Sequence, residues 1–267
     1  MKRLKLMASD MVQSCVKRTK SSFENWLKET RFNLELVIPR TVCVMMNVVI
    51  QAKKQSRFLC AREESENSQY RYHSDVYIFL KDVIQEMFTS FIAKLNTVLE
   101  SLLSKVARYD QGSILAPMFS LRNPGTELEE TYLTFVKLNL ERFRAHLNEE
   151  KMKKQLIKDW YTSILTKICD WLSDRMSMAL HQYQVQTLLT LAAELPQFVS
   201  EDLSSSRVIY CRTYNTVFSR LRVEDAMHKG QSIYATEDQP YPGSDGEDDE
   251  ETESSDEEAF VKLETGN

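Results

Sequence analysis

Three residue types that carry acid–base chemistry lie close together in residues 171–188, which read WLSDRMSMALHQYQVQTL. They are Asp174, Arg175 and His181. The apolar residues around them recur every three or four positions, which predicts one continuous helix. On such a helix Asp174 and His181 would stand about 10 Å apart along the axis, beyond hydrogen-bond reach. The trio is therefore interpreted as the polar flank of a packing helix, and no catalytic residue is predicted.

Other site motifs are missing from the sequence. The four histidines are scattered without an H-E-x-x-H spacing, the glycines form no phosphate-binding loop, and no G-x-S-x-G or EF-hand pattern occurs. We therefore expect no metal site and no cofactor in this chain. The cysteines are odd in number, far apart and without a C-x-x-C pair, which favours free thiols in a reducing compartment; they are Cys15, Cys43, Cys60, Cys169 and Cys211.

The elements around these residues are predicted to be helices, because only six glycines occur in 267 residues and the apolar spacing is helical almost throughout. The clearest helix runs from a cap at Ser74 to Tyr109, with a heptad-like seam. Its members are Leu80, Ile84, Met87, Phe91, Leu95, Val98, Leu102 and Val106. The run after Thr41 is rich in β-branched residues, so a strand remains an alternative there.

The remaining predicted helices have less regular seams. They cover residues 2–29, 126–147, a long stretch from Leu156 to Leu195 that Pro196 stops or kinks, and 207–228. The first is expected to bury an apolar stripe that includes Met7, Met11, Cys15, Phe23 and Leu27. The fold class predicted from these elements is all-α, an elongated bundle of long antiparallel helices over residues 1–229.

Charge divides the chain into a basic body and an acidic tail. From residue 231 onward there are 13 acids and one base, which leaves 26 acids and 33 bases before it. The tail, residues 230–267, is too charged and too poor in apolar residues to pack, so we expect disorder there. Ser244, Ser254 and Ser255 each precede a glutamate by three residues and are candidate phosphorylation sites.

Basic side chains in two helices are candidates for binding a partner or an anionic lipid surface, with an ordinary solvated helix face as the alternative. They are Lys2, Arg3, Lys5, Lys17, Arg18, Lys151, Lys153, Lys154 and Lys158. Nucleic acid is not expected as a partner, because no groove-reading module accompanies the charge. No apolar run reaches the roughly 18 residues of a transmembrane span, and the first residues lack a signal-peptide core, so a cytoplasmic location is predicted.

Four segments, dispersed in order along the chain, together carry a resemblance to a known family. They read KRLKLMASDMVQSCVKRT, LSKVARYDQG, WLSDRMSMALHQYQ and SRLRVEDA. In this order they resemble the C-terminal part of the calcium-dependent activator proteins for secretion (CAPS), namely the distal MUN region and the tail that follows it. The resemblance implies a helical MUN-like bundle, and a chain that is a fragment or a truncated product of a longer protein.

The resemblance also implies a function. CAPS proteins prime dense-core vesicles for calcium-triggered exocytosis by engaging SNARE proteins such as syntaxin, and their C-terminal region is associated with vesicle binding. We therefore expect a non-catalytic protein associated peripherally with vesicles, plasma membrane or synapse, with neighbouring MUN helices as further partners. Nothing here resembles the calcium-binding and phosphoinositide-binding modules of the family, and the 110–127 loop is shorter than expected.

The alternatives are an acidic-tail chaperone for a basic partner such as a histone, and a structural end-cap of a larger helical rod.

Overall fold

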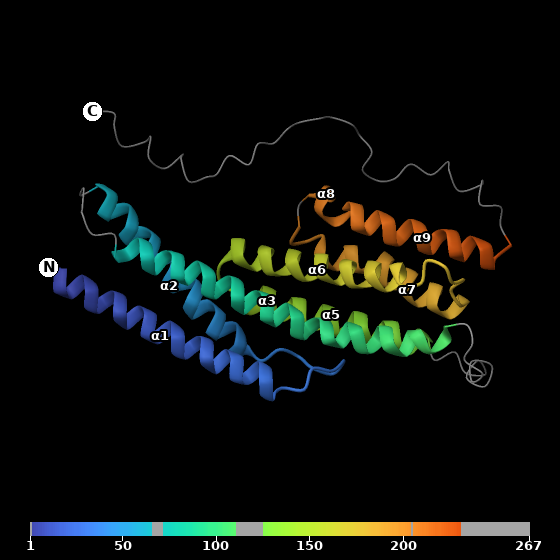
Figure 1. Cartoon of the computed structure of the whole chain (residues 1–267), viewed down its shortest axis with the longest axis horizontal. Helices are drawn as coiled ribbons and strands as arrows, with labels where there is room; N and C mark the ends of the chain where they lie inside the picture. The colour runs from blue at the N-terminus through green and yellow to red at the C-terminus, as the bar shows by residue number, and fades with distance from the viewer. Residues whose placement is uncertain (1, 66–71, 111–124, 204, 231–267) are drawn as a thin grey trace, which may run out of the picture.

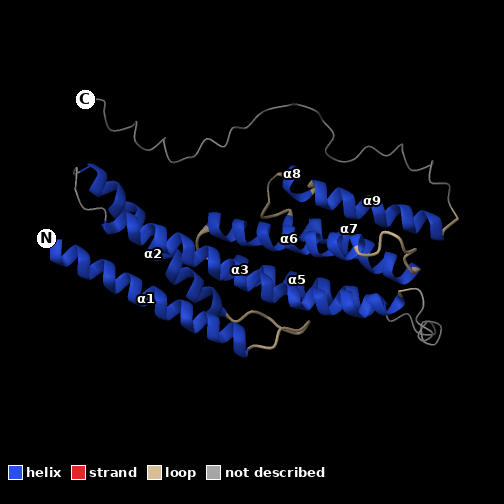
Figure 2. Cartoon of the chain, in the orientation of Figure 1, coloured by secondary structure: helices blue, strands red, loops and turns tan. Residues whose placement is uncertain are grey.

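A computed structural model describes residues 2–65, 72–110, 125–203 and 205–230. Within these residues every regular element is a helix, as Figure 2 shows, so the predicted all-α class is confirmed. The predicted disorder of the tail and its three candidate serines lie outside the described residues. The helices are α1 (Lys2–Glu29), α2 (Arg40–Ser65), α3 (Tyr72–Val106), α5 (Gly125–His146), α6 (Glu150–Ser173), α7 (Gln182–Val199), α8 (Ser206–Ile209) and α9 (Arg212–His228).

The long helices run back and forth along one axis and form an elongated bundle (Figure 1). With 35 residues, α3 is about 52 Å long at 1.5 Å per residue. It contacts α1 and α2 on one side of the bundle and α5 and α6 on the other. The last helices complete the second half, where α7 packs on α5 and α9. The central helix α3 thus joins both halves.

The heptad-like seam predicted for α3 is confirmed, because all eight of its residues are buried. The helix begins at Tyr72, two residues before the predicted cap at Ser74, and continues as a single 3₁₀ turn from Ala107 to Tyr109. The segment after Thr41 is helical, so the strand alternative is wrong.

A chain of aromatic rings crosses the core and links four helices. The ring of Phe91 in α3 packs edge-on against Phe23 of α1 and Phe143 of α5, with centroid distances of 6.0 and 5.8 Å. Phe143 in turn meets Trp160 of α6 at 5.9 Å. All four side chains are almost completely buried. Edge-to-face pairs of this kind add to the stabilisation from burial, so these rings hold α1, α3, α5 and α6 together.

The connector between α1 and α2 is held by one buried amide side chain. Asn139 of α5 is fully buried, and its Oδ1 accepts a hydrogen bond from the backbone N–H of Ile38 at 2.8 Å. Its Nδ2 donates to the carbonyl oxygens of Leu36 at 3.0 Å and Phe135 at 2.8 Å. Buried backbone groups need hydrogen-bond partners. The Asn139 amide provides the partners that this non-helical segment cannot find within its own backbone.

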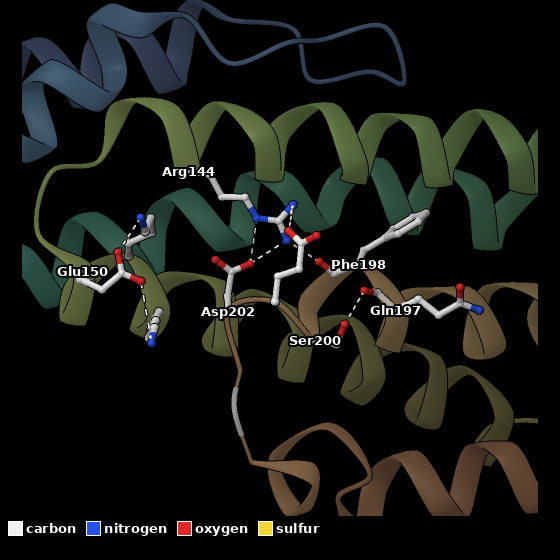
Figure 3. Close-up of polar contacts among 9 residues, drawn as sticks. Arg144, Glu150, Gln197, Phe198, Ser200 and Asp202 are labelled. Atoms are coloured by element: carbon white, nitrogen blue, oxygen red, sulfur yellow. Dashed lines mark hydrogen bonds and ion pairs between the residues drawn. The ribbon is translucent and has the colours of Figure 1, made fainter.

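The C-terminal end of α7 is held to α5 by Arg144. Its guanidinium binds the buried carboxylate of Asp202 at 2.7 Å and 3.0 Å and donates to the carbonyl of Phe198, as Figure 3 shows. A positive charge at this position also interacts favourably with the negative end of the helix dipole. Arg144 therefore fixes where α7 ends relative to α5.

One predicted helix boundary is wrong, and one alternative at another is excluded. Pro196 does not stop α7, which continues to Val199, so of the two predicted effects of this proline only a kink remains. The predicted helix 207–228 is divided in the structure, since α8 ends at Ile209 and α9 starts at Arg212. The Tyr161 hydroxyl of α6 donates to the Ile209 carbonyl at 2.7 Å. This hydrogen bond replaces the one that a further turn of α8 would have provided.

Candidate functional site at the α6–α7 junction

The stretch predicted as one helix through Asp174 and His181 is a junction between two helices. α6 ends at Ser173, and residues 174–181 reverse the chain direction before α7 begins. Asp174 caps the C-terminal end of α6, whereas His181 caps the N-terminal end of α7. The prediction of a continuous packing helix is therefore wrong here. Arg175 and His181 make side-chain contacts within this turn, whereas Asp174 is exposed at its start.

Arg175 connects this turn to the end of α3. Its Nε and one terminal nitrogen donate to the two carboxylate oxygens of Asp110 at 2.9 and 2.8 Å. The guanidinium also lies 3.8 Å from the ring centroid of Trp171 and donates to the carbonyl of that residue at 3.1 Å. A planar, bidentate and stacked arginine is not replaceable by lysine without loss of these contacts.

Gln184 and His181 fix the start of α7. His181 Nδ1 accepts from the backbone N–H of Tyr183 at 3.2 Å, and Gln184 Oε1 accepts from the backbone N–H of His181 at 2.7 Å. This reciprocal pair is a capping box. Gln184 Nε2 also donates to the Val106 carbonyl at 3.0 Å and to Asp110 Oδ1 at 2.9 Å. One glutamine therefore joins the start of α7 to the end of α3.

The last helix contacts the same turn. Arg220 of α9 donates to the Met178 carbonyl at 3.5 Å and pairs with Glu224 at 2.6 Å. The His228 ring nitrogen lies 2.8 Å from the Leu180 carbonyl oxygen. Three of the four segments that carry the CAPS resemblance thus meet at this junction, through residues 103–110, 171–184 and 219–226. Sequence reasoning singled out these segments separately but did not predict that they touch.

The polar groups of the junction are engaged in packing contacts. The Asp110 carboxylate is paired with Arg175, and the His181 nitrogen that faces the helix start accepts a backbone hydrogen bond. No nucleophile is held against either group by the contacts described above. Within the described residues, no group of three or more His, Cys, Asp and Glu side chains is placed to hold a metal ion. The contacts described here position three helices relative to one another.

Acid should weaken this junction. The hydrogen bond from Arg175 holds the pKa of Asp110 below its ordinary value of 3.8; burial opposes this effect, and Gln184 and the Arg175 charge add to it. A lowered pKa in the folded state gives stability that is complete above the ordinary value and is lost as the pH falls through the folded value. We expect the free energy of unfolding of the wild type to fall more steeply between about pH 5 and 3 than that of Asp110→Asn. Urea titrations at several pH values measure this difference.

The matched control is Asp174→Asn, which changes a neighbouring exposed carboxylate at the end of α6. This variant should keep the wild-type dependence on pH. Parallel curves for Asp110→Asn and the wild type would contradict the assigned role of the Arg175–Asp110 pair.

The candidate basic residues lie in two groups, on α1 and on the first turns of α6, with α3 in contact with both helices. In α1, Arg18 is exposed and the Lys17 ammonium lies over the Phe79 ring, 5.7 Å from its centroid. The side chains of Lys2, Arg3 and Lys5 lie outside the described residues. Among the described side chains the two groups lie on different helices, and their role in binding stays a prediction.

The α6 group is partly neutralised. Glu150 pairs with Lys153 at 2.6 Å and with Lys154 at 3.8 Å, as Figure 3 shows around the labelled Glu150. The hydrogen bond from Lys153 lowers the Glu150 pKa. Lys151 and Lys158 are exposed. Of the four α6 candidates, these two are the most accessible to an anionic partner.

Several large apolar side chains are exposed where sequence reasoning expected a core. Met7 and Met11 of α1 are 57% and 71% exposed, and Cys15, one turn further on, is also exposed. The buried stripe of α1 contains the predicted Phe23 and Leu27, and Val16 in place of Cys15. The predicted stripe is therefore wrong in the first half of α1. Its three residues form an outer face at helical spacing, which we call the α1 outer face.

A buried cysteine and an exposed cysteine of this chain should be alkylated at different rates. Cys43 is fully buried, and burial raises the pKa of its thiol to about 11, although the Arg142 charge opposes the shift. Because the thiolate is the reactive form, Cys43 of the native protein should be alkylated at least about 100-fold more slowly than the exposed Cys15 at pH 8. Peptide mapping after timed iodoacetamide treatment measures both rates. Equal rates in the native protein, or slow Cys43 labelling after unfolding in urea, would contradict this prediction.

Residues 1–156 match the family model of the MUN domain, which is more than half of the chain. The chain belongs to the MUN domain family. The match ends inside α6, whereas the MUN-family bundle seen here continues through α9. The single domain predicted over residues 1–229 therefore stays a prediction.

This MUN-family chain is also similar to a curated protein named calcium-dependent secretion activator from Drosophila melanogaster. The two are 32% identical over 248 residues, which is 89% of this chain and 17% of that protein. The resemblance to CAPS is thereby confirmed. The chain spans less than one fifth of the length of this relative. No solved structure matches the chain. None of the described helices of this MUN-family chain has the length and apolar character needed to span a membrane.

Proposed function

We propose that the chain acts without catalysis as a priming or tethering factor in calcium-regulated exocytosis of dense-core vesicles. The observation that carries the proposal is the 32% identity, over most of this chain, to a protein named for calcium-dependent activation of secretion. In this role the chain binds SNARE proteins such as syntaxin and vesicles, and is associated peripherally with secretory vesicles, plasma membrane or synapse.

The architecture supports a binding role. Long helices leave extended exposed faces, and amphipathic partner helices bind such faces without an active site. The polar residues with catalytic potential at the α6–α7 junction are engaged in packing contacts. The exposed Lys151 and Lys158 offer positive charge to an acidic partner or an anionic lipid surface.

Neighbouring helices of a longer MUN region are proposed as the partner of the α1 outer face. The α1 outer face places three apolar side chains next to one another at helical spacing, and two of them are methionines more than half exposed. An exposed cluster of this kind indicates an interaction surface. Covering Met7, Met11 and Cys15 would extend the bundle beyond α1. In the end-cap alternative the chain also packs against these neighbouring helices, but it binds no other partner.

The test uses the purified chain and a version that ends at Gly230, with syntaxin, assembled SNARE complex and isolated dense-core vesicles as binding partners. Both versions should bind syntaxin or the SNARE complex at low and moderate salt. Reversing the charge of Lys151 and Lys158 should weaken binding, whereas reversing the exposed Arg57 of α2 is the matched control. Absence of binding by the full chain would overturn the proposal.

The version that ends at Gly230 also separates the proposal from the histone-chaperone alternative. A chaperone that works through its acidic tail should lose nearly all affinity for a basic partner when the tail is removed. A bundle that binds SNARE helices should keep most of its affinity. Loss of syntaxin binding together with the tail would contradict binding through the bundle.

A further inference from the structure

Three aromatic rings follow one another along one side of α9 and the residues just before it. Tyr210 packs edge-on against Tyr214 with a centroid distance of 5.2 Å, and Tyr214 stacks on Phe218 at 5.5 Å. We call these three residues the aromatic row. One turn further on, the guanidinium of the exposed Arg222 lies 5.8 Å from the Phe218 centroid. Tyr210 and Phe218 are half-buried, so part of each side chain stays in solvent.

A row of this kind is suited to an extended, proline-containing segment. Recognition modules bind proline-rich peptides on exposed aromatic side chains, and the peptide loses little entropy because proline already holds it extended. The chain contains such a segment, since residues 240–242 read Pro-Tyr-Pro. This segment follows α9 closely in the sequence and lies in the tail, outside the described residues.

The last residue after α9 turns the chain away from the helix axis. Gly230 has a φ of 64°, in the left-handed region, and its N–H donates to the Met227 carbonyl at 3.2 Å. A left-handed residue at this position ends a helix, and glycine adopts it without the strain that a side chain would cause. The tail therefore starts in a direction different from that of α9.

The length of the tail before Pro240 matches the distance back to the aromatic row. Tyr214 lies 16 residues before Gly230, which is about 24 Å along α9 at 1.5 Å per residue. An extended proline-type chain covers this distance in about eight residues at 3.1 Å each. If the tail runs back along α9, the Pro-Tyr-Pro segment therefore comes level with Tyr210 and Tyr214.

The same path leads on to the lysines at the start of α6. α6 and α9 run in the same direction (Figure 1), because Tyr161 of α6 meets the end of α8 and the turn after α6 meets His228 near the end of α9. Lys158 lies one turn before Tyr161 on the same face of α6, and Lys151 lies two turns before Lys158. Both lysines are exposed.

The tail carries the opposite charge at the corresponding distance. Residues 243–258 contain ten acids and no base. About five extended residues cover the roughly 15 Å of α6 between Tyr161 and Lys151. The acidic run thus comes beside Lys151 and Lys158 when the Pro-Tyr-Pro segment lies on the aromatic row. Attraction between the two charged segments favours this arrangement.

We propose that residues 231–258 fold back along α9, with Pro-Tyr-Pro on the aromatic row and the acidic run against Lys151 and Lys158. Weak individual contacts suffice for this, because a tethered segment has an effective concentration in the millimolar range. The bound tail competes with any other anionic partner for the two lysines. The proposal rests on the rings, the end of α9 and the charges, and it does not depend on SNARE proteins as partners.

The test is hydroxyl-radical footprinting of the full chain, read by mass spectrometry as the oxidation rates of Tyr210 and Phe218. The variant Pro240→Ser, Tyr241→Ser, Pro242→Ser removes the docking segment and leaves every residue of the bundle unchanged. A segment bound at least half of the time halves the oxidation of what it covers, so both rates should rise at least about two-fold in this variant.

The matched control makes three serine substitutions elsewhere in the tail, namely Ala259→Ser, Phe260→Ser and Val261→Ser. These positions lie beyond the acidic run, and this variant should keep the wild-type oxidation rates at the aromatic row. The half-buried Phe32, in the connector after α1, is an internal reference whose rate should be the same in all variants.

Charge reversal tests the contact with α6. Lys151→Glu combined with Lys158→Glu should raise the oxidation rates at the aromatic row at least about two-fold, as expected for the loss of two exposed ion pairs. Lys28→Glu combined with Arg57→Glu makes the same change of charge at exposed positions of α1 and α2 and should have no effect. Circular dichroism verifies that both variants are folded.

Three results would overturn the proposal. The first is equal oxidation of the aromatic row in the wild type and the Pro-Tyr-Pro variant, and the second is an equal rise in the matched tail control. The third is protection that disappears on about 50-fold dilution, because the effective concentration of a tethered segment does not depend on that of the protein. Loss on dilution would instead assign the contact to the tail of a second copy.

Discussion

Replacing Phe91 with alanine is expected to lower the free energy of unfolding by about 4 kcal/mol, the usual cost of removing a buried phenylalanine ring. Phe91 is fully buried in α3, and its ring contacts Phe23, Trp26 and Phe143. Alanine would leave a cavity where α1, α3 and α5 meet. The partner rings belong to α1 and α5. These helices cannot both move in to fill the cavity, because each is also packed against other helices. Urea unfolding followed by far-ultraviolet circular dichroism measures the change.

Two further variants make this prediction specific. Phe91→Leu keeps most of the apolar volume and should cost clearly less, about 1 to 1.5 kcal/mol. Ile78→Ala removes a large apolar side chain from the same helix at a position that is 57% exposed, and should cost less than about 0.5 kcal/mol. If Phe91→Ala were no more destabilising than Ile78→Ala, the aromatic chain would not be the centre of the core.

Replacing Asn139 with leucine is expected to cost about 3 kcal/mol, although leucine is similar in size and more apolar. The substitution leaves the N–H of Ile38 and the carbonyl of Leu36 without the partner that Asn139 provides. The Ile38 amide is buried and the Leu36 carbonyl is partly buried. A buried unpaired backbone group costs about 1–3 kcal/mol. Hydrogen exchange should show faster exchange at the Ile38 amide, and urea unfolding gives the total.

The controls separate loss of hydrogen bonds from a general effect of leucine. Asn25→Leu makes the same substitution at an exposed position of α1 and should change stability by less than about 0.5 kcal/mol. Asn139→Asp retains an acceptor for Ile38 but loses both donated hydrogen bonds. Slow exchange at Ile38 in Asn139→Leu would show that the connector is held by other contacts.

The sequence predicted the long helices well because their seams depend on local spacing. The eight seam residues of α3 are buried as expected, since this helix has neighbours on more than one side. The break between α6 and α7 could not be predicted in this way. No glycine or proline lies between Ser173 and Gln182, and Met176, Ala179 and Tyr183 continue the helical spacing across the turn by coincidence. The turn is made by Asp110 and Val106, more than 60 residues earlier in the chain.

Capping and orientation account for the other differences. Histidine is not among the residues preferred as helix N-caps, so His181 gave no boundary signal. In α1 the spacing of Met7, Met11 and Cys15 indicated a stripe correctly, but spacing alone does not say which stripe faces the neighbouring helices. α2 and α3 contact the side that carries Val16 and Phe23.

The bidentate pair between Arg175 and Asp110 has a mechanical consequence. Sliding the α6–α9 half along α3 by one helical turn, about 5.4 Å, would separate this pair and the Gln184 contacts together. These contacts therefore oppose sliding of the α6–α9 half along α3. A displacement of α9 is expected to carry the end of α3 with it, so the two halves of the bundle should move together.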